Sequence, residues 1–91
     1  MIEKRDYTPR TITVKPAGPL EGHEFSMTRI SAADWVAMRR GDLDDGGLVA
    51  SALGCIEDSS LPDGTELDLE EGLALMRAWV AAHKEAAVPP A

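Results

Sequence analysis

Residues 68–87, DLEEGLALMRAWVAAHKEAA, contain the longest periodic apolar pattern in this chain of 91 residues. Asp68-Leu69-Glu70-Glu71 matches a capping box, in which the first side chain accepts a hydrogen bond from the amide three residues later. Apolar residues then recur at helical spacing in two offset stripes. Leu69, Leu73, Met76 and Val80 form one stripe, and Leu75, Trp79 and Ala82 form the other. The pattern predicts a helix from Leu69 to about Ala87, ended by Pro89-Pro90.

A second capping pattern lies upstream, at Ser31-Ala32-Ala33-Asp34. Ser31 can cap the helix, and Ile30 and Trp35 stand where a hydrophobic staple needs apolar side chains. Two arginines precede Gly41, and glycine commonly ends a helix in the left-handed conformation. We therefore expect a short helix over 32–40.

The segment between these two helices predicts a third helix and a loop. Asp44 or Asp45 can cap it, and the apolar residues of LVASALGCI (48–56) have helical spacing. We expect it to end near Ile56, because acidic residues follow and are unfavourable at the negative end of a helix. Residues 59–65, SSLPDGT, are typical of a turn.

Two alternating segments precede the first helix. In residues 10–15, RTITVK, and 23–29, HEFSMTR, apolar and polar residues alternate, which predicts strands with one apolar face. The Pro/Gly-rich segment between them predicts a hairpin with a wide connection.

These elements predict an α+β fold, with a short N-terminal antiparallel β-hairpin packed on about three α-helices. We expect one small domain over residues 10–87, a flexible tail over 1–9 and a flexible C-terminus over 88–91. A hairpin is only marginally stable alone, so its apolar face must rest on helices. The expected core is Ile12, Val14, Phe25, Met27, Trp35, Leu53, Leu73 and Met76.

Charge is segregated along the chain. Ten acidic residues and no Lys or Arg lie between Gly41 and Met76, whereas residues 1–40 carry a net charge of +2. The total of −7 disfavours binding to nucleic acid or to an anionic membrane surface, and it favours a basic partner. The first ten residues are polar, and no run approaches the length of a membrane span, so we expect a cytoplasmic protein.

No residue pattern indicates chemistry. Asp42-Leu43-Asp44-Asp45-Gly46-Gly47 partly matches a calcium loop, but Gly46 and Leu53 stand where that loop needs oxygen ligands. His23, His83 and Cys55 show no zinc-ligand spacing, and a thiol within LVASALGCI is usually buried and inert. We therefore expect no catalytic residues, no metal site and no cofactor.

The stripe Leu75-Trp79-Ala82 is the candidate partner-binding site. One stripe of the last helix is enough for a small core, so the other could anchor a helix of another protein. For Trp79 we favour burial in the core over this role, because large aromatic side chains are mostly buried. The small size of the domain also favours a partner or self-association.

The order of elements resembles that of the small tail assembly chaperones of long-tailed bacteriophages. The resemblance rests on EFSMTRIS (24–31), DWVAMRR (34–40), LVASALGCI (48–56) and LDLEEGLALMRAWVAAHKEA (67–86). It implies a non-enzymatic protein in the host cytoplasm that coats the tape measure protein during tail assembly. It also implies an optional longer product of ribosomal frameshifting. Because that family is defined by its role more than by a sequence motif, the resemblance assigns no functional residue to a position in this chain.

Three other classes remain open from the sequence, and a small-molecule enzyme is the least supported of them. A minor virion or head–tail joining protein would be found in purified particles, whereas a chaperone would not. An acidic DNA mimic would compete with DNA for a protein, although the slightly basic N-terminal part of this chain argues against it.

Overall fold

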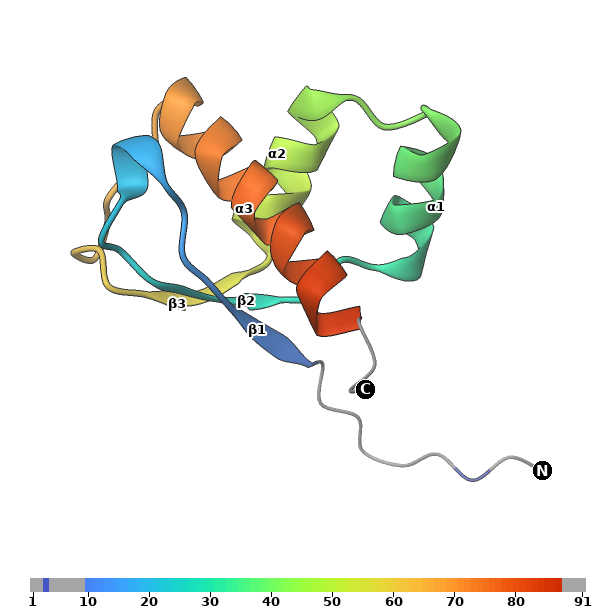
Figure 1. The fold of residues 1–91 in the computed structure, drawn as a ribbon, viewed down its shortest axis with the longest axis horizontal. Helices are drawn as coiled ribbons and strands as arrows, with labels where there is room; N and C mark the ends of the chain where they lie inside the picture. Colours follow the sequence, from blue (N-terminus) through green and yellow to red (C-terminus); the bar gives the residue numbers. More distant parts are fainter. Residues whose placement is uncertain (1–2, 4–9, 88–91) are drawn as a thin grey trace.

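The computed structural model describes Glu3 and residues 10–87, without the side chains of residues 85–87, and it is an α+β domain (Figure 1). Apart from Glu3, the predicted flexible segments over 1–9 and 88–91 lie outside the described residues. The elements in chain order are β1 (Thr11–Val14), the short 3₁₀ helix η1 (Gly18–Leu20), β2 (Phe25–Thr28), α1 (Ala32–Arg40), α2 (Asp45–Gly54), β3 (Ile56–Ser59) and α3 (Leu69–Ala87). No helix in this part of the chain has the length and hydropathy of a membrane span.

The predicted hairpin is present and carries a third strand. The sheet is antiparallel in the order β1-β2-β3, with Val14 opposite Phe25 and Met27 opposite Ile56. β3 was not predicted, because Glu57 and Asp58 have low strand propensity and the apolar pattern before them is helical. Pairing with β2 determines its conformation, and its register shifts between Ser26 and Met27.

The capping patterns place the helix ends where the sequence predicts them. Ser31 Oγ accepts from the amide of Asp34 at 3.1 Å, and Gly41 ends α1 in the left-handed conformation at φ 79°. Asp44 caps α2 through the amide of Gly47. The box at the start of α3 is complete: Asp68 Oδ1 accepts from the Glu71 amide at 2.8 Å, and Glu71 Oε1 accepts from the Asp68 amide at 3.0 Å.

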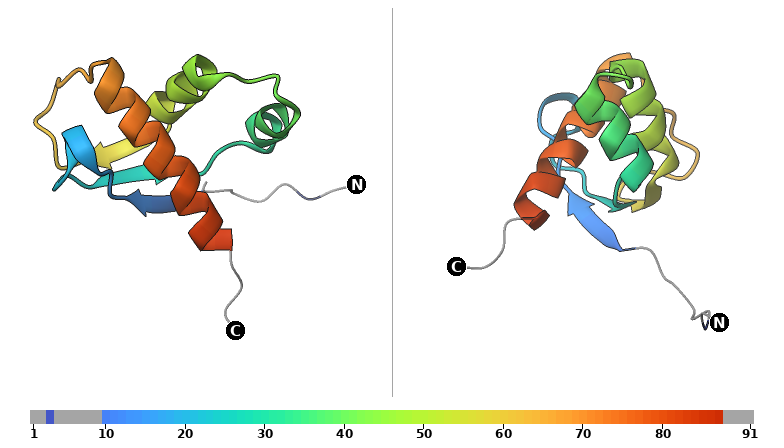
Figure 2. Two further views of the ribbon diagram at one scale, coloured as in Figure 1. Left: turned by 45° about the horizontal axis from the view of Figure 1, so that its top comes forward. Right: turned by 90° about the vertical axis from the view of Figure 1, so that its right-hand side faces the viewer.

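α2 and α3 lie on one side of the sheet, α1 lies beside them, and the opposite face of the sheet carries no helix (Figure 2). α3 runs diagonally across the sheet and packs against α2, β1 and η1. A Cβ at position 72 would lie 3.1 Å from Val49 Cγ1, so Gly72 allows α2 and α3 to approach closely. The buried core consists of Val14, Leu20, Phe25, Met27, Leu48, Ala52, Leu75, Met76 and Trp79.

Half of the expected core is correct, and the buried face of α3 contains Leu75 and Trp79 beside Met76 instead of Leu73. Val14, Phe25, Met27 and Met76 are buried, whereas Ile12, Trp35 and Leu73 are only half-buried. Leu75 and Trp79 are fully buried in their place, and Leu69 is 74% exposed. α3 contacts both the sheet and α2. The side of α3 that carries Leu75, Met76 and Trp79 is therefore the buried one.

Leu53 was also expected in the core but is 43% exposed. It lies one position beyond Ala52, and Leu48 and Ala52 form the buried face of α2. Leu20, in the wide connection of the hairpin, is fully buried in the core. A single apolar residue in a Pro/Gly-rich loop gives no periodic signal, so the sequence did not reveal it.

Candidate functional site

A hollow that we call the acidic cleft is lined by the end of α2, by β3 and by loop 60–67, together with Phe25 of β2. Its volume is 570 Å³. We call the apolar side chains that line it the floor, and Leu53, which is 43% exposed, is one of them. The others are Phe25, Ile56, Leu61, Pro62 and Leu67.

Four exposed carboxylates surround this floor: Glu57, Asp58, Asp63 and Glu66. Across the described residues, the one ion pair joins Lys15 and Glu24, with Nζ and Oε1 3.5 Å apart. No Lys or Arg there neutralises the four carboxylates. An apolar floor with an unneutralised acidic rim is complementary to an amphipathic segment that carries Lys or Arg.

Local hydrogen bonds shape the loop that forms one wall of the cleft. Pro62 O accepts from the Thr65 amide at 3.2 Å and from Thr65 Oγ1 at 2.6 Å, which closes a turn. The capping box of α3 fixes the far end of the loop. The turn signal was visible in the sequence, but the apolar floor was not, because its residues come from four separate segments: β2, α2, β3 and the loop.

The structure does not place the predicted partner stripe on the surface. Leu75 and Trp79 have no exposed surface, and Ala82 is half-buried. The interpretation of Leu75 and Trp79 as exposed anchors is therefore wrong, and the burial favoured for Trp79 is confirmed. Both side chains are buried because α3 packs against α2 and the sheet.

Trp79 and His83 instead connect α3 to the end of β2. Trp79 Nε1 donates to Thr28 O at 3.0 Å, and the Ile30 amide donates to His83 Nε2 at 2.7 Å. His83 Nδ1 lies 2.7 Å from Trp79 O, and because Nε2 accepts from the Ile30 amide, Nδ1 is the ring nitrogen that donates to this carbonyl. Both ring nitrogens are thus occupied by backbone groups, which gives His83 a structural role.

Cys55 lies where its thiol is held in the protonated form. It is half-buried, and burial raises its pKa above the usual range; the carboxylates of Asp34 and Glu57 raise it further. A protonated thiol is a weak nucleophile and a weak metal ligand. No cluster of three metal-ligating side chains occurs among the described residues.

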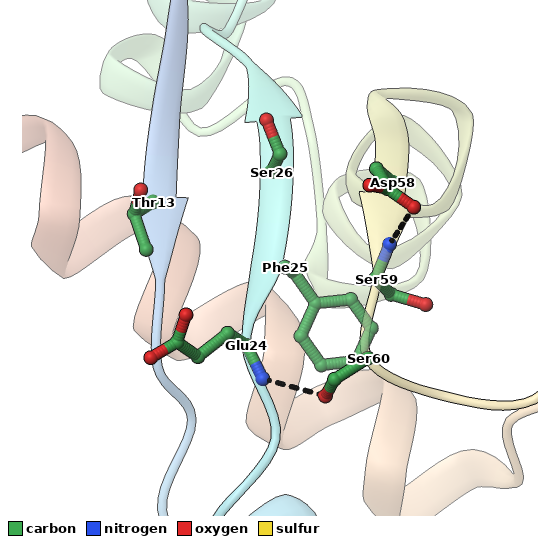
Figure 3. A pocket seen from close by; sticks show the side chains of 7 residues that line it. All are labelled: Thr13, Glu24, Phe25, Ser26, Asp58, Ser59 and Ser60. Atoms are coloured by element: carbon green, nitrogen blue, oxygen red, sulfur yellow. Dashed lines mark hydrogen bonds between the residues drawn. The ribbon is translucent and has the colours of Figure 1, made fainter.

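A smaller hollow of 290 Å³ lies on the polar face of the sheet (Figure 3). Thr13, Ser26 and Asp58 form a row across the three strands there. Beside it, Ser60 Oγ lies 3.1 Å from His23 Nδ1 and accepts from the Glu24 amide at 3.0 Å. The Ser60 amide also donates to Glu24 O, so these contacts extend the pairing of β2 and β3.

A third hollow, of 270 Å³, lies between the helices and has the opposite charge. Met38, Leu48, Met76 and Val80 line it, and Arg77 and Lys84 stand at its margin with Asp45. This margin is less suited to a basic partner than the rim of the acidic cleft.

Comparisons with protein-family models, with curated proteins and with solved structures found no match.

Proposed function

We propose that this chain is a non-enzymatic protein-binding module whose acidic cleft holds a basic, amphipathic helical segment of another protein. One observation carries the proposal: the cleft combines a partly exposed apolar floor at Leu53 with a rim of four carboxylates that no described cation neutralises. Apolar contact would supply affinity, and the rim would supply orientation and faster association.

The size of the cleft limits how the client is held. A volume of 570 Å³ accommodates a few apolar side chains of a helix, with the rest of that helix remaining in water. Each contact would then be weak, and a long client would be held by many copies acting together. The tape measure protein of a long-tailed phage, which the sequence resemblance implies as the client, is a long and largely helical chain of this kind.

The direct test is co-purification with a tape measure protein of a long-tailed phage, using pairs of matched variants. Leu53→Asp places a charge in the apolar floor, so we expect loss of the complex. Leu69→Asp is the control, because Leu69 is 74% exposed and lies outside the cleft. Equal loss of binding in both variants would contradict the proposed position of the site.

The rim is tested separately by charge reversal. Asp63→Lys with Glu66→Lys should weaken the complex and reduce its sensitivity to salt, because screening acts on the interaction between rim and client. Asp42→Lys with Glu70→Lys makes the same charge change away from the cleft. Recovery of the chain in purified particles would instead support a virion component, and competition with DNA for a protein would support a DNA mimic.

A further inference from the structure

The two edges of the sheet differ in charge. The outer edge of β3 carries Glu57 and Asp58, and β1 (Thr11–Val14) carries no charged residue. Across the described residues, no strand pairs with either outer edge. Charges on an edge strand oppose pairing with another chain, so β3 is protected and β1 is not.

The backbone of β1 presents a regular row of hydrogen-bonding groups at this edge. The Arg29 amide donates to Arg10 O at 3.1 Å, which makes Arg10 a hydrogen-bonded position opposite β2. Such positions alternate in an antiparallel pair, so Ile12 and Val14 also direct their amides toward β2. Thr11, Thr13 and Lys15 therefore direct theirs outward, and all three residues are exposed.

We propose that a second copy of this chain pairs antiparallel along β1, with Thr13 opposite its own counterpart. In this register the outward-facing positions hydrogen-bond to one another, and Ile12 lies opposite Val14 of the second copy. Directly opposed residues share a face of the sheet, so both apolar residues stay on the helix-covered side. The half-buried side chain of Ile12 would then gain cover at the edge.

Charge favours this edge over the other for contact between identical chains. Pairing two copies through β3 would bring Glu57 and Asp58 against the same residues of the second copy, and like charges placed directly opposite are destabilising. In the β1 pair, Lys15 lies opposite Thr11 of the second copy. The segment that contains β1, residues 1–40, is also the less acidic part of a chain of charge −7.

Amide hydrogen exchange of the full chain, measured by NMR at increasing concentration, tests the proposed register. The amides of Thr11, Thr13 and Lys15 should become protected as concentration rises, in step with the mass from sedimentation equilibrium. Those of Ile12 and Val14 should be protected throughout. A monomeric mass at every concentration would overturn the proposal, and so would a dimer in which the outward amides stay unprotected.

Substitutions at Thr13 distinguish loss of the β1 contact between copies from loss of the fold of each copy. Thr13→Pro removes an amide that makes no hydrogen bond to any described residue, so the dimer should be lost while the thermal melt of the monomer is kept. Thr13→Asp places like charges opposite each other at the two-fold axis and tests the same contact if the proline variant unfolds. Thr13→Val keeps the amide and should remain dimeric.

The outcome is independent of the proposed function, because the acidic cleft lies at the opposite edge of the sheet. Thr13→Asp should leave client binding at a single cleft intact, and Leu53→Asp should leave the dimer intact. A Thr13→Asp variant that is still dimeric would overturn the β1 contact.

Discussion

α1 and α3 contrast in how they contribute to the domain. α1 has a cap, a C-terminal glycine and favourable end charges, yet none of its residues is buried, and it lies at the side of the molecule (Figure 1). α3 packs on the sheet, α2 and η1, and it supplies three residues of the core. Clear helix signals therefore define where an element begins and ends, but they do not determine how much stability it adds.

A single side-chain hydrogen bond links α1 to α2. Ser51 Oγ donates to Asp34 Oδ2 at 2.8 Å. This bond replaces the second half of the capping box, because Asp34 does not reach back to the Ser31 amide. The carboxylate that the sequence assigns to helix capping is used for tertiary contact.

The two tryptophans provide the largest test of this contrast. Trp79→Ala should destabilise the domain by about 3–5 kcal/mol, because it empties a fully buried position and removes the bond to Thr28 O. Small domains are typically stable by about 0.05–0.15 kcal/mol per residue, so much of the fold would be lost. Trp35→Ala, at a half-buried position in α1, should cost about 1 kcal/mol. Urea denaturation followed by circular dichroism measures both, and equal losses would contradict the contrast.

His83 gives a test of intermediate size. His83→Leu keeps an apolar body but leaves the Ile30 amide without its acceptor, which should cost about 1–3 kcal/mol. His23→Leu is the matched control, because His23 lies near the exposed hydroxyl of Ser60, and it should cost about 0.5 kcal/mol or less. If His83→Leu matched wild type in urea, the bond to Ile30 would contribute nothing measurable.

The sequence was sufficient where structure depends on neighbouring residues and insufficient where it depends on packing. Ser31, Gly41, Asp44 and Asp68 mark helix ends through local hydrogen bonds, and each does so in the structure. By contrast, the two stripes of α3 are equally periodic, so periodicity could not show that Trp79 faces the core. That choice depends on where α2 and the sheet lie.

The same distinction explains the site. Leu53 lies within a helical apolar pattern, and only the position of α2 shows that it is left partly exposed beside loop 60–67. β3 is a strand because β2 offers it partners, and its acidic residues then become one rim of the cleft. The acidic segment was evident from the sequence, whereas the apolar floor beneath it required the fold.

The smallest expected effect concerns the contact between α1 and α2. The pKa of the Cys55 thiol is the quantity that should change when this contact is weakened. Burial raises the pKa of Cys55 most, and the Asp34 carboxylate of α1 adds to this increase. Ser51→Ala removes the hydrogen bond to Asp34, so α1 should move away and the pKa of the thiol should fall toward its usual value. The pH dependence of alkylation by iodoacetamide, which reacts with the thiolate, measures the change.

The sign of the accompanying change in stability follows from linkage. The folded chain holds the thiol proton of Cys55 more tightly than the unfolded chain does. The stability that this difference contributes to the fold is fully present below the unfolded pKa of Cys55. It is lost as pH rises through the folded value. Glu57→Gln should also lower the pKa while leaving α1 in place, so it separates loss of charge from movement of the helix. If Ser51→Ala and Asp34→Asn both left the alkylation profile unchanged, α1 would not be acting on Cys55. The tertiary role assigned to Asp34 would then be wrong.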